Sequence, residues 1–136
     1  MPSVFARILA GQIPGQFVFR DELWAALLDI HPAAPGHALL IPLHQAQYLA
    51  DLPASTLAAL GDRLARLTAA VKTASGAPAV SIVLSDGPAA GQEVPHVHFH
   101  VFPRFPNDGM PLSWPATPYA DGELARWAER LRTAWK

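Results

Sequence analysis

Cysteine is absent from this sequence of 136 residues. Its absence excludes disulfide bonds and thiolate metal ligands, although it assigns no cellular compartment by itself. An excess of charge of one sign is also missing, because Lys and Arg total 10, Asp and Glu total 11, and the formal net charge is -1. A chain without an overall positive field gives little support to nucleic-acid binding through phosphate neutralisation. A small anionic ligand is compatible with this composition.

Long hydrophobic runs are missing as well. Apolar stretches such as residues 38–41 are far shorter than the roughly 20 residues that a membrane-spanning helix needs. Arg7, Gly11 and Pro14 interrupt the N-terminal segment, which therefore lacks the apolar centre of a signal peptide. We expect a cytoplasmic protein with no membrane partner. With 51% apolar and 15% charged residues, the chain suits one globular domain over residues 1–136.

The spacing of apolar residues predicts an α+β fold, with an antiparallel sheet of about five strands. Strands are expected over residues 17–20, 23–29, 37–41 and 79–84, the last of them buried, and through the histidine-rich segment near residue 98. A short helix is expected over residues 4–10, and a long amphipathic helix over residues 54–75. Large apolar side chains after the first hairpin turn are expected in the core, namely Trp24, Leu27, Leu28 and Ile30.

The C-terminal part has a different character. Four prolines fall between residues 105 and 120, which predicts a Pro-rich loop or arm. A C-terminal helix is expected over residues 121–136, with Asp121 as its N-cap. Its apolar stripe consists of Leu124, Trp127, Leu131 and Trp135.

Histidine is concentrated in one place. Three of the 6 histidines, His96, His98 and His100, occupy alternate positions of a segment whose other residues are apolar. Because successive side chains of a strand point to opposite faces, the three imidazoles share one face and the intervening residues enter the core. Burial of three neutral imidazoles is costly unless each is hydrogen-bonded, so we expect the array to serve chemistry.

Two chemical uses compete. Histidines at alternate strand positions chelate metals, but the outer pair lies roughly 13 Å apart at the α-carbons, too far for all three to reach one tetrahedral ion. Other candidate ligands, Glu93, Asp86, Asp29 and His37, keep a metal-dependent hydrolase open as an alternative. In the second use a neutral imidazole attacks phosphorus, with one ring nitrogen free and the other donating its proton to a backbone carbonyl. The small-residue loop before the histidines offers backbone N–H groups, at residues 91–94, for phosphate oxygens.

The pattern His96-Val97-His98-Phe99-His100-Val101-Phe102 resembles the signature of the histidine triad (HIT) superfamily. The resemblance extends, in family order, to residues 5–14, 28–32, 35–37, 41–42 and 86–92, and covers about residues 4–104. It implies a HIT-like fold, a homodimer in which two sheets join, and a purine nucleotide substrate cleaved at the α-phosphate through a covalent nucleotidyl-histidine. Both the nucleoside phosphoramidase branch and the branch that hydrolyses diadenosine polyphosphates are similar to this chain.

The resemblance also implies a role for each matching residue. His98 corresponds to the nucleophile, His96 and His100 to its neighbours that orient it and contact phosphate or assist the leaving group, and His37 to a supporting fourth histidine. Asp29 corresponds to the residue that binds ribose hydroxyls. The implied base pocket consists of Phe5, Ile8, Ile13, Leu27 and Ile30, and the implied phosphate loop of Ser85, Gly91, Gln92, Glu93 and Val94.

Three positions depart from the pattern of many bacterial relatives, in which two cysteines and a histidine bind a structural zinc. This chain has Ser3, Ala6 and Gln45 there, and His44 beside the last position does not replace it, so the sequence supports neither zinc nor another cofactor. Ser85 and Glu93 replace an asparagine and a hydroxyl residue near the phosphate. These two replacements keep open a further alternative, a nucleotide-binding module with little turnover.

Overall fold

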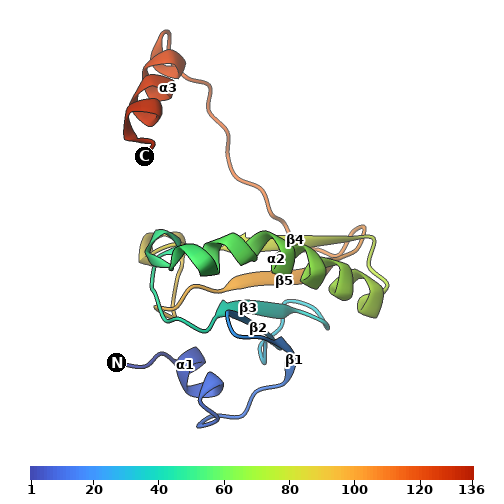
Figure 1. Cartoon of the computed structure of the whole chain (residues 1–136). Helices are drawn as coiled ribbons and strands as arrows, with labels where there is room; N and C mark the ends of the chain where they lie inside the picture. The colour runs from blue at the N-terminus through green and yellow to red at the C-terminus, as the bar shows by residue number, and fades with distance from the viewer.

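A single five-stranded antiparallel sheet forms the centre of the computed structural model, which describes residues 1–136 (Figure 1). Its strand order is β1-β2-β3-β5-β4, so that β3 pairs with β5 across a long separation in sequence. This arrangement confirms the predicted α+β class and antiparallel sheet. The strands are β1 (Phe17–Arg20), β2 (Trp24–Leu28), β3 (Ala38–Pro42), β4 (Ala79–Leu84) and β5 (Phe99–Arg104).

One face of the sheet is covered by the long helix α2 (Ala54–Ser75), which has the predicted bounds. Its stripe packs through Leu67 and Val71 against a buried cluster that includes Trp24 and the apolar residues between the histidines. The indole N–H of Trp24 donates to the backbone oxygen of Thr56 at 2.9 Å and so ties the start of α2 to β2. Gly76 ends the helix in a left-handed conformation with φ of 74°.

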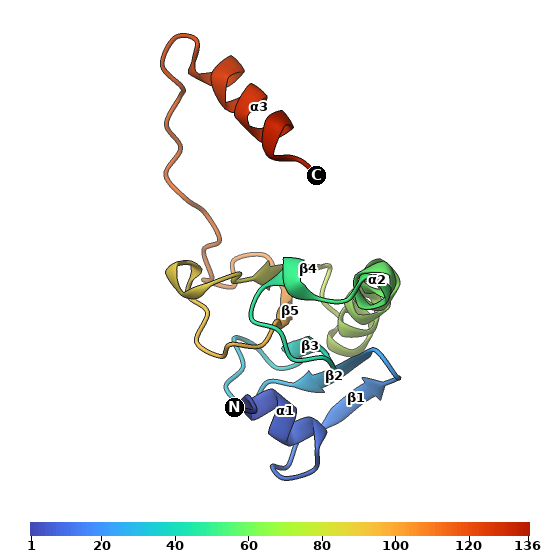
Figure 2. The ribbon, with the colours of Figure 1, turned by 60° about the vertical axis from the view of Figure 1, so that its left-hand side comes forward.

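The opposite face carries the short helix α1 (Val4–Leu9), and the two helices lie on different sides of the sheet in Figure 2. Phe5 of α1 packs into a second buried cluster with Ala25, Leu27, Leu39 and Ile41. These residues alternate along β2 and β3 with those that face α2. α1 therefore lies on the face of the sheet that the histidines share.

Several expectations about burial were wrong. The strand at residues 79–84 was expected to be buried, but β4 is an edge strand and leaves Ile82 46% exposed. Leu28 and Ile30 were expected in the core, yet they are 42% and 82% exposed because β2 ends at Leu28 and the chain then leaves the sheet. The histidine segment is a regular strand only from Phe99 onward. His96 lies in a bend before β5, and His98 lies in the irregular residues between that bend and the strand.

Two 3-10 turns, η1 (Leu49–Asp51) and η2 (Pro88–Ala90), lie in the connections before α2 and before the histidines. After β5 the chain runs out as an extended arm, and α3 (Glu123–Ala134) stands away from the sheet in both views (Figures 1 and 2). Asp121 is not its N-cap; Gly122 takes that position with φ of 78° and no side-chain cap. The predicted apolar stripe exists but is exposed, with Trp135 at 87%. None of the helices combines the length and apolar character needed to cross a membrane.

Candidate active site

A cavity of about 510 Å³ opens between α1, the end of β2 and the segment that leads into β5. Most of the predicted site residues line it, which brings together parts of the chain that are far apart in sequence. These residues are Phe5, Ile8, Ile13, Leu27, Asp29, Ile30, Gly91, Glu93, Val94, His98 and His100. The remaining predicted residues, His37, Ser85, Gln92 and His96, do not line it.

The cavity also has walls that the predicted site did not include. Val4, Pro14, Gly15, Leu28, His31 and Leu39 contribute to it. A Cβ at Gly15 would lie 2.7 Å from Cγ2 of Ile8, so glycine is required for the close approach of this loop to α1. The sequence placed Leu28 in the core. Its exposure depends on β2 ending at this residue, and the apolar pattern does not show where the strand ends.

His98 is held by the backbone of the residue two positions before it. Its Nδ1 lies 2.7 Å from the carbonyl oxygen of His96. Because a carbonyl oxygen only accepts, Nδ1 holds the proton, and the lone pair of the neutral ring is on Nε2. The ring lines the cavity and meets the ring of Phe5 edge-on at 4.9 Å. This is the tautomer that an imidazole nucleophile needs.

His96 is fully buried, and both of its ring nitrogens are occupied. Nε2 lies 2.8 Å from the backbone oxygen of Pro42, and Nδ1 lies 2.7 Å from Oγ of Ser3. Burial lowers the pKa of His96, with its backbone partner offsetting part of this effect. His96 does not line the cavity, and both of its ring nitrogens already have partners within the protein.

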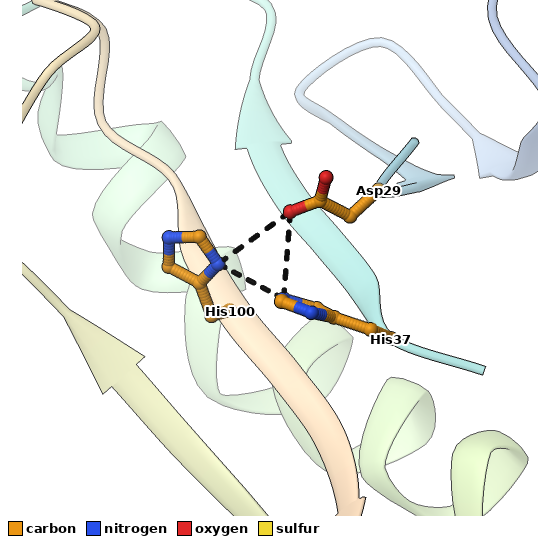
Figure 3. A group of neighbouring side chains, drawn as sticks. All are labelled: Asp29, His37 and His100. Carbon is orange, nitrogen blue, oxygen red and sulfur yellow. Dashed lines mark hydrogen bonds and ion pairs between the residues drawn. The ribbon is translucent and has the colours of Figure 1, made fainter. Parts of the chain in front are cut away.

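His37, the residue just before β3, is hydrogen-bonded to His100 of β5 (Figure 3). The backbone N–H of Ala33 donates to Nδ1 of His37 at 2.9 Å, and therefore the proton of the neutral ring is on Nε2. That N–H donates to Nδ1 of His100 at 2.9 Å, which leaves a proton on Nε2 of His100. Desolvation lowers the pKa of both histidines, and the nearby carboxylate of Asp29 opposes the shift.

Asp29 lies beside this pair, 3.6 Å from Nε2 of His37 and 3.9 Å from Nδ1 of His100 through Oδ2. Its Oδ1 accepts from the backbone N–H of His31, whereas Oδ2 accepts no hydrogen bond. A carboxylate oxygen at the cavity wall is therefore available to a ligand hydroxyl.

Asp29, His37 and His100 also have the spacing of a metal site, since their ligand atoms lie within 4.8 Å of one another. A point equidistant from the three atoms lies about 2.0 Å from each, close to zinc–ligand bond lengths. The hydrogen bonding does not fit, however. Ala33 donates to Nδ1 of His37, which puts the proton on Nε2, the nitrogen that would bind the ion. A metal at this place requires that hydrogen bond to break.

The implied phosphate loop has two kinds of backbone N–H groups, those with an acceptor in the chain and those without one. Of the backbone N–H groups at residues 91–94, that of Gly91 donates to Pro88 and that of Gln92 to Gly87. The side chain of Gln92 is buried and bonded within the protein, accepting from Gly87 and donating to Gln47. The N–H groups of Glu93 and Val94 donate to no acceptor of the chain. These two amides are the ones available to a phosphate.

Charged side chains around the cavity are of one sign. Asp29 and Glu93 line it, and neither Lys nor Arg does. The side chain of Glu93 is exposed and takes part in no ion pair or hydrogen bond. Ser85 does not line the cavity, and its Oγ lies 3.8 Å from the position that a Cβ of Gly91 would occupy. The cavity therefore offers amides and imidazoles to an anion, but no cationic side chain.

A sheet with one long helix on one face and alternate histidines on the other defines an α+β protein of the histidine-triad class. The HIT domain model matches residues 10–107, and the chain belongs to the HIT domain family. An uncharacterized HIT-like protein of Mycobacterium tuberculosis is 42% identical over 116 residues, covering 83% of this chain and 77% of that protein. The adenosine 5'-monophosphoramidase of Schizosaccharomyces pombe is 31% identical over 138 residues and 100% of both chains. A HIT family structure from Bacillus subtilis shares the fold, with a TM-score of 0.92 at 24% identity, covering 100% of this chain and 99% of that one.

Proposed function

We propose that the protein is a nucleotide hydrolase that cleaves at the α-phosphate of a purine nucleotide conjugate through a covalent nucleotidyl-His98. The observation that carries this proposal is the hydrogen bond from Nδ1 of His98 to the backbone oxygen of His96. Because Nδ1 holds the proton, the lone pair on Nε2 is free to attack a substrate, and the ring of His98 lines the cavity. The name of the S. pombe relative supports hydrolase chemistry on a nucleotide.

In the proposed first step, Nε2 of His98 attacks the α-phosphorus, a P–N bond forms, and the bond from phosphorus to the leaving group breaks. The imidazole gains positive charge, which the carbonyl of His96 stabilises through Nδ1. The ring of His100 lies 5.0 Å from that of His98, and His37 holds it so that its Nε2–H can donate a hydrogen bond to the leaving group, which takes its proton from solvent. Water then attacks phosphorus and loses a proton to solvent, the P–N bond breaks, and nucleoside monophosphate leaves neutral His98.

Substrate binding follows the chemistry of the cavity walls. The apolar wall of Phe5, Ile8, Ile13, Leu27 and Ile30 suits a nucleobase. Oδ2 of Asp29 has free acceptor capacity for ribose hydroxyls, and the two unpaired amides of the phosphate loop suit the α-phosphate oxygens. The apolar wall draws on α1 and the end of β2, Asp29 follows β2, and the two amides precede β5, so a bound nucleotide would bridge these three parts of the chain.

The charge of the cavity favours one of the two substrate classes. A nucleoside phosphoramidate carries a single phosphate, whereas a diadenosine polyphosphate brings several adjacent negative charges. With Asp29 and Glu93 at the cavity and no Lys or Arg, the additional phosphates have no cationic partner. We therefore propose a nucleoside phosphoramidate as the preferred substrate.

The test is AMP release from adenosine 5′-phosphoramidate and from diadenosine tri- and tetraphosphate. Wild-type protein should release AMP from the phosphoramidate, and His98→Ala should not. Equal release by that variant contradicts the mechanism. Binding without release by the wild-type protein identifies a nucleotide-binding module instead. Loss of activity with a chelator, and its return with a divalent ion, identifies the metal-dependent hydrolase.

We also propose a homodimer that forms through β4. This strand is an unpaired sheet edge with an exposed Ile82, and an exposed edge readily pairs with a second copy about a twofold axis. The stripe of Leu124, Trp127, Leu131 and Trp135 on α3 is exposed as well, on a helix that the arm carries away from its own sheet. Exposed apolar surface of this extent is typical of a partner contact.

A further inference from the structure

Ser3 lies outside the cavity, yet it makes a direct contact with the triad. Its Oγ lies 2.7 Å from Nδ1 of His96, across 93 positions of sequence, and both residues are buried. The same oxygen accepts from the N–H of Ala6 at 2.9 Å and caps the start of α1. The N–H of Ser3 donates to Oε1 of Gln45 at 2.9 Å. Ser3 thus joins α1, the segment after β3 and the histidines.

The proton positions in this network follow from the acceptors. The carbonyl of Pro42 accepts only, so that Nε2 of His96 holds the ring proton and Nδ1 presents a lone pair. The hydroxyl of Ser3 has one proton, which it donates to that lone pair, and its oxygen accepts from Ala6. The arrangement satisfies every group only while His96 is neutral. A proton on Nδ1 would leave the Ser3 hydroxyl with no acceptor there.

We propose that Ser3 is a positioning residue that keeps His96 neutral and in one tautomer. A fixed His96 ring also fixes the backbone at this residue, whose carbonyl accepts the Nδ1 proton of His98. Ser3 therefore acts on the nucleophile through His96 and touches no substrate. The tautomer of His96 can be measured without any reaction, whereas the effect on turnover rests on the function proposed above.

Three substitutions separate the parts of this role. Ser3→Ala removes both the donor to His96 and the cap of α1. Ser3→Asp keeps a good N-cap but has no proton to donate, and its negative charge favours a proton on Nδ1 of His96. Ser3→Thr keeps the hydroxyl. Gln45→Ala is the matched control, because it removes the other tie to Ser3 and leaves the hydroxyl in place.

Imidazole ¹⁵N spectra report the tautomer and charge of His96, and they are read beside the turnover number for AMP release as a function of pH. In wild-type protein we expect one protonated and one bare nitrogen at neutral pH. In Ser3→Asp both nitrogens should be protonated, and turnover should rise with pH as His96 loses its second proton. In Ser3→Ala turnover should fall about tenfold, the rate equivalent of one hydrogen bond. Ser3→Thr should restore the wild-type spectrum, and Gln45→Ala should keep it.

An unchanged His96 spectrum in both Ser3→Ala and Ser3→Asp overturns the proposal, even if activity falls, because Ser3 then serves only to dock α1. Wild-type turnover in both variants overturns it as well. If Ser3→Ala does not fold, the capped Ser3→Asp variant decides alone. Absence of AMP release by the wild-type protein would contradict the proposed function. The ¹⁵N spectra would still test whether Ser3 sets the tautomer of His96.

Discussion

Nε2 of His37 donates to Nδ1 of His100 at 2.9 Å, although the two residues are 63 positions apart in the sequence. The antiparallel pairing of β3 with β5 creates this contact, because Leu39 lies opposite His100 and His37, two residues before Leu39, is its diagonal neighbour on the same face of the sheet. His37 occupies Nδ1 of His100, so that only Nε2 of His100 is left to act on a ligand.

Loss of the His37 donor should impair turnover. In His37→Leu the ring of His100 loses the partner that keeps its orientation, and we expect AMP release to fall about tenfold, since His100, proposed to donate a hydrogen bond to the leaving group, loses one hydrogen bond. His37→Gln, whose amide can still donate to His100, should recover part of the rate. Steady-state turnover of adenosine 5′-phosphoramidate measures both. The exposed His44→Ala variant is the control for removal of a histidine, and a His37→Leu enzyme as fast as this control would contradict the role.

Acid should destabilise the folded protein. Burial lowers the pKa of His37, His96 and His100 below the ordinary value of 6.5. As pH falls through 6.5, the unfolded chain therefore binds protons that the folded chain does not, and the free energy of unfolding decreases. The slope is at most about 1.4 kcal/mol per pH unit for each such histidine. Full stability is reached above this window.

Urea unfolding at pH 5, 6, 7 and 8 measures this dependence. The decrease between pH 7 and pH 5 should be smaller in His37→Gln, which removes one of the three groups. It should keep its wild-type size in His31→Ala, which removes an exposed histidine. A free energy of unfolding that is constant over this range would contradict the burial argument.

Local periodicity was enough to predict much of this molecule. The stripe of α2 appears as expected, and the apolar residues that alternate with the histidines enter the core, although the regular strand begins only at Phe99. The exposure of Leu28 and Ile82 depends instead on where β2 ends and on which strand lies at the edge, and no local pattern contains that information. The contact of Ser3 with His96 likewise depends on how α1 docks, which only the assembled fold determines.

The charge of Glu93 should influence substrate choice. In Glu93→Gln one of the two acidic groups at the cavity is removed, so diadenosine tetraphosphate hydrolysis should rise relative to phosphoramidate hydrolysis. A change of about fivefold is expected from the loss of one screened like-charge contact on the order of 1 kcal/mol. The ratio of the two kcat/KM values at low and high salt is the measurement, and the change should shrink at high salt.

The control for this experiment is Glu22→Gln, which removes the same charge at an exposed position in the turn between β1 and β2. Its ratio should equal that of the wild-type protein. If both variants shift the ratio equally, the effect comes from net charge alone. Glu93 would then have no specific role in selection.

The proposed dimer uses the β4 edge of the sheet and leaves the β1 edge free. Ile82→Glu puts a buried charge into a β4–β4 contact, and we expect the variant to sediment as a monomer because the cost of an unpaired charge exceeds that of the lost apolar contact. Val18→Glu is the matched control, since Val18 is 52% exposed on β1 at the opposite edge. It should sediment as a dimer, like the wild-type protein. Monomers in all three samples would contradict the proposed dimer. Dimers in all three would show that the contact does not form through β4. Trp127→Glu on α3 would then test whether the exposed stripe of that helix forms the contact.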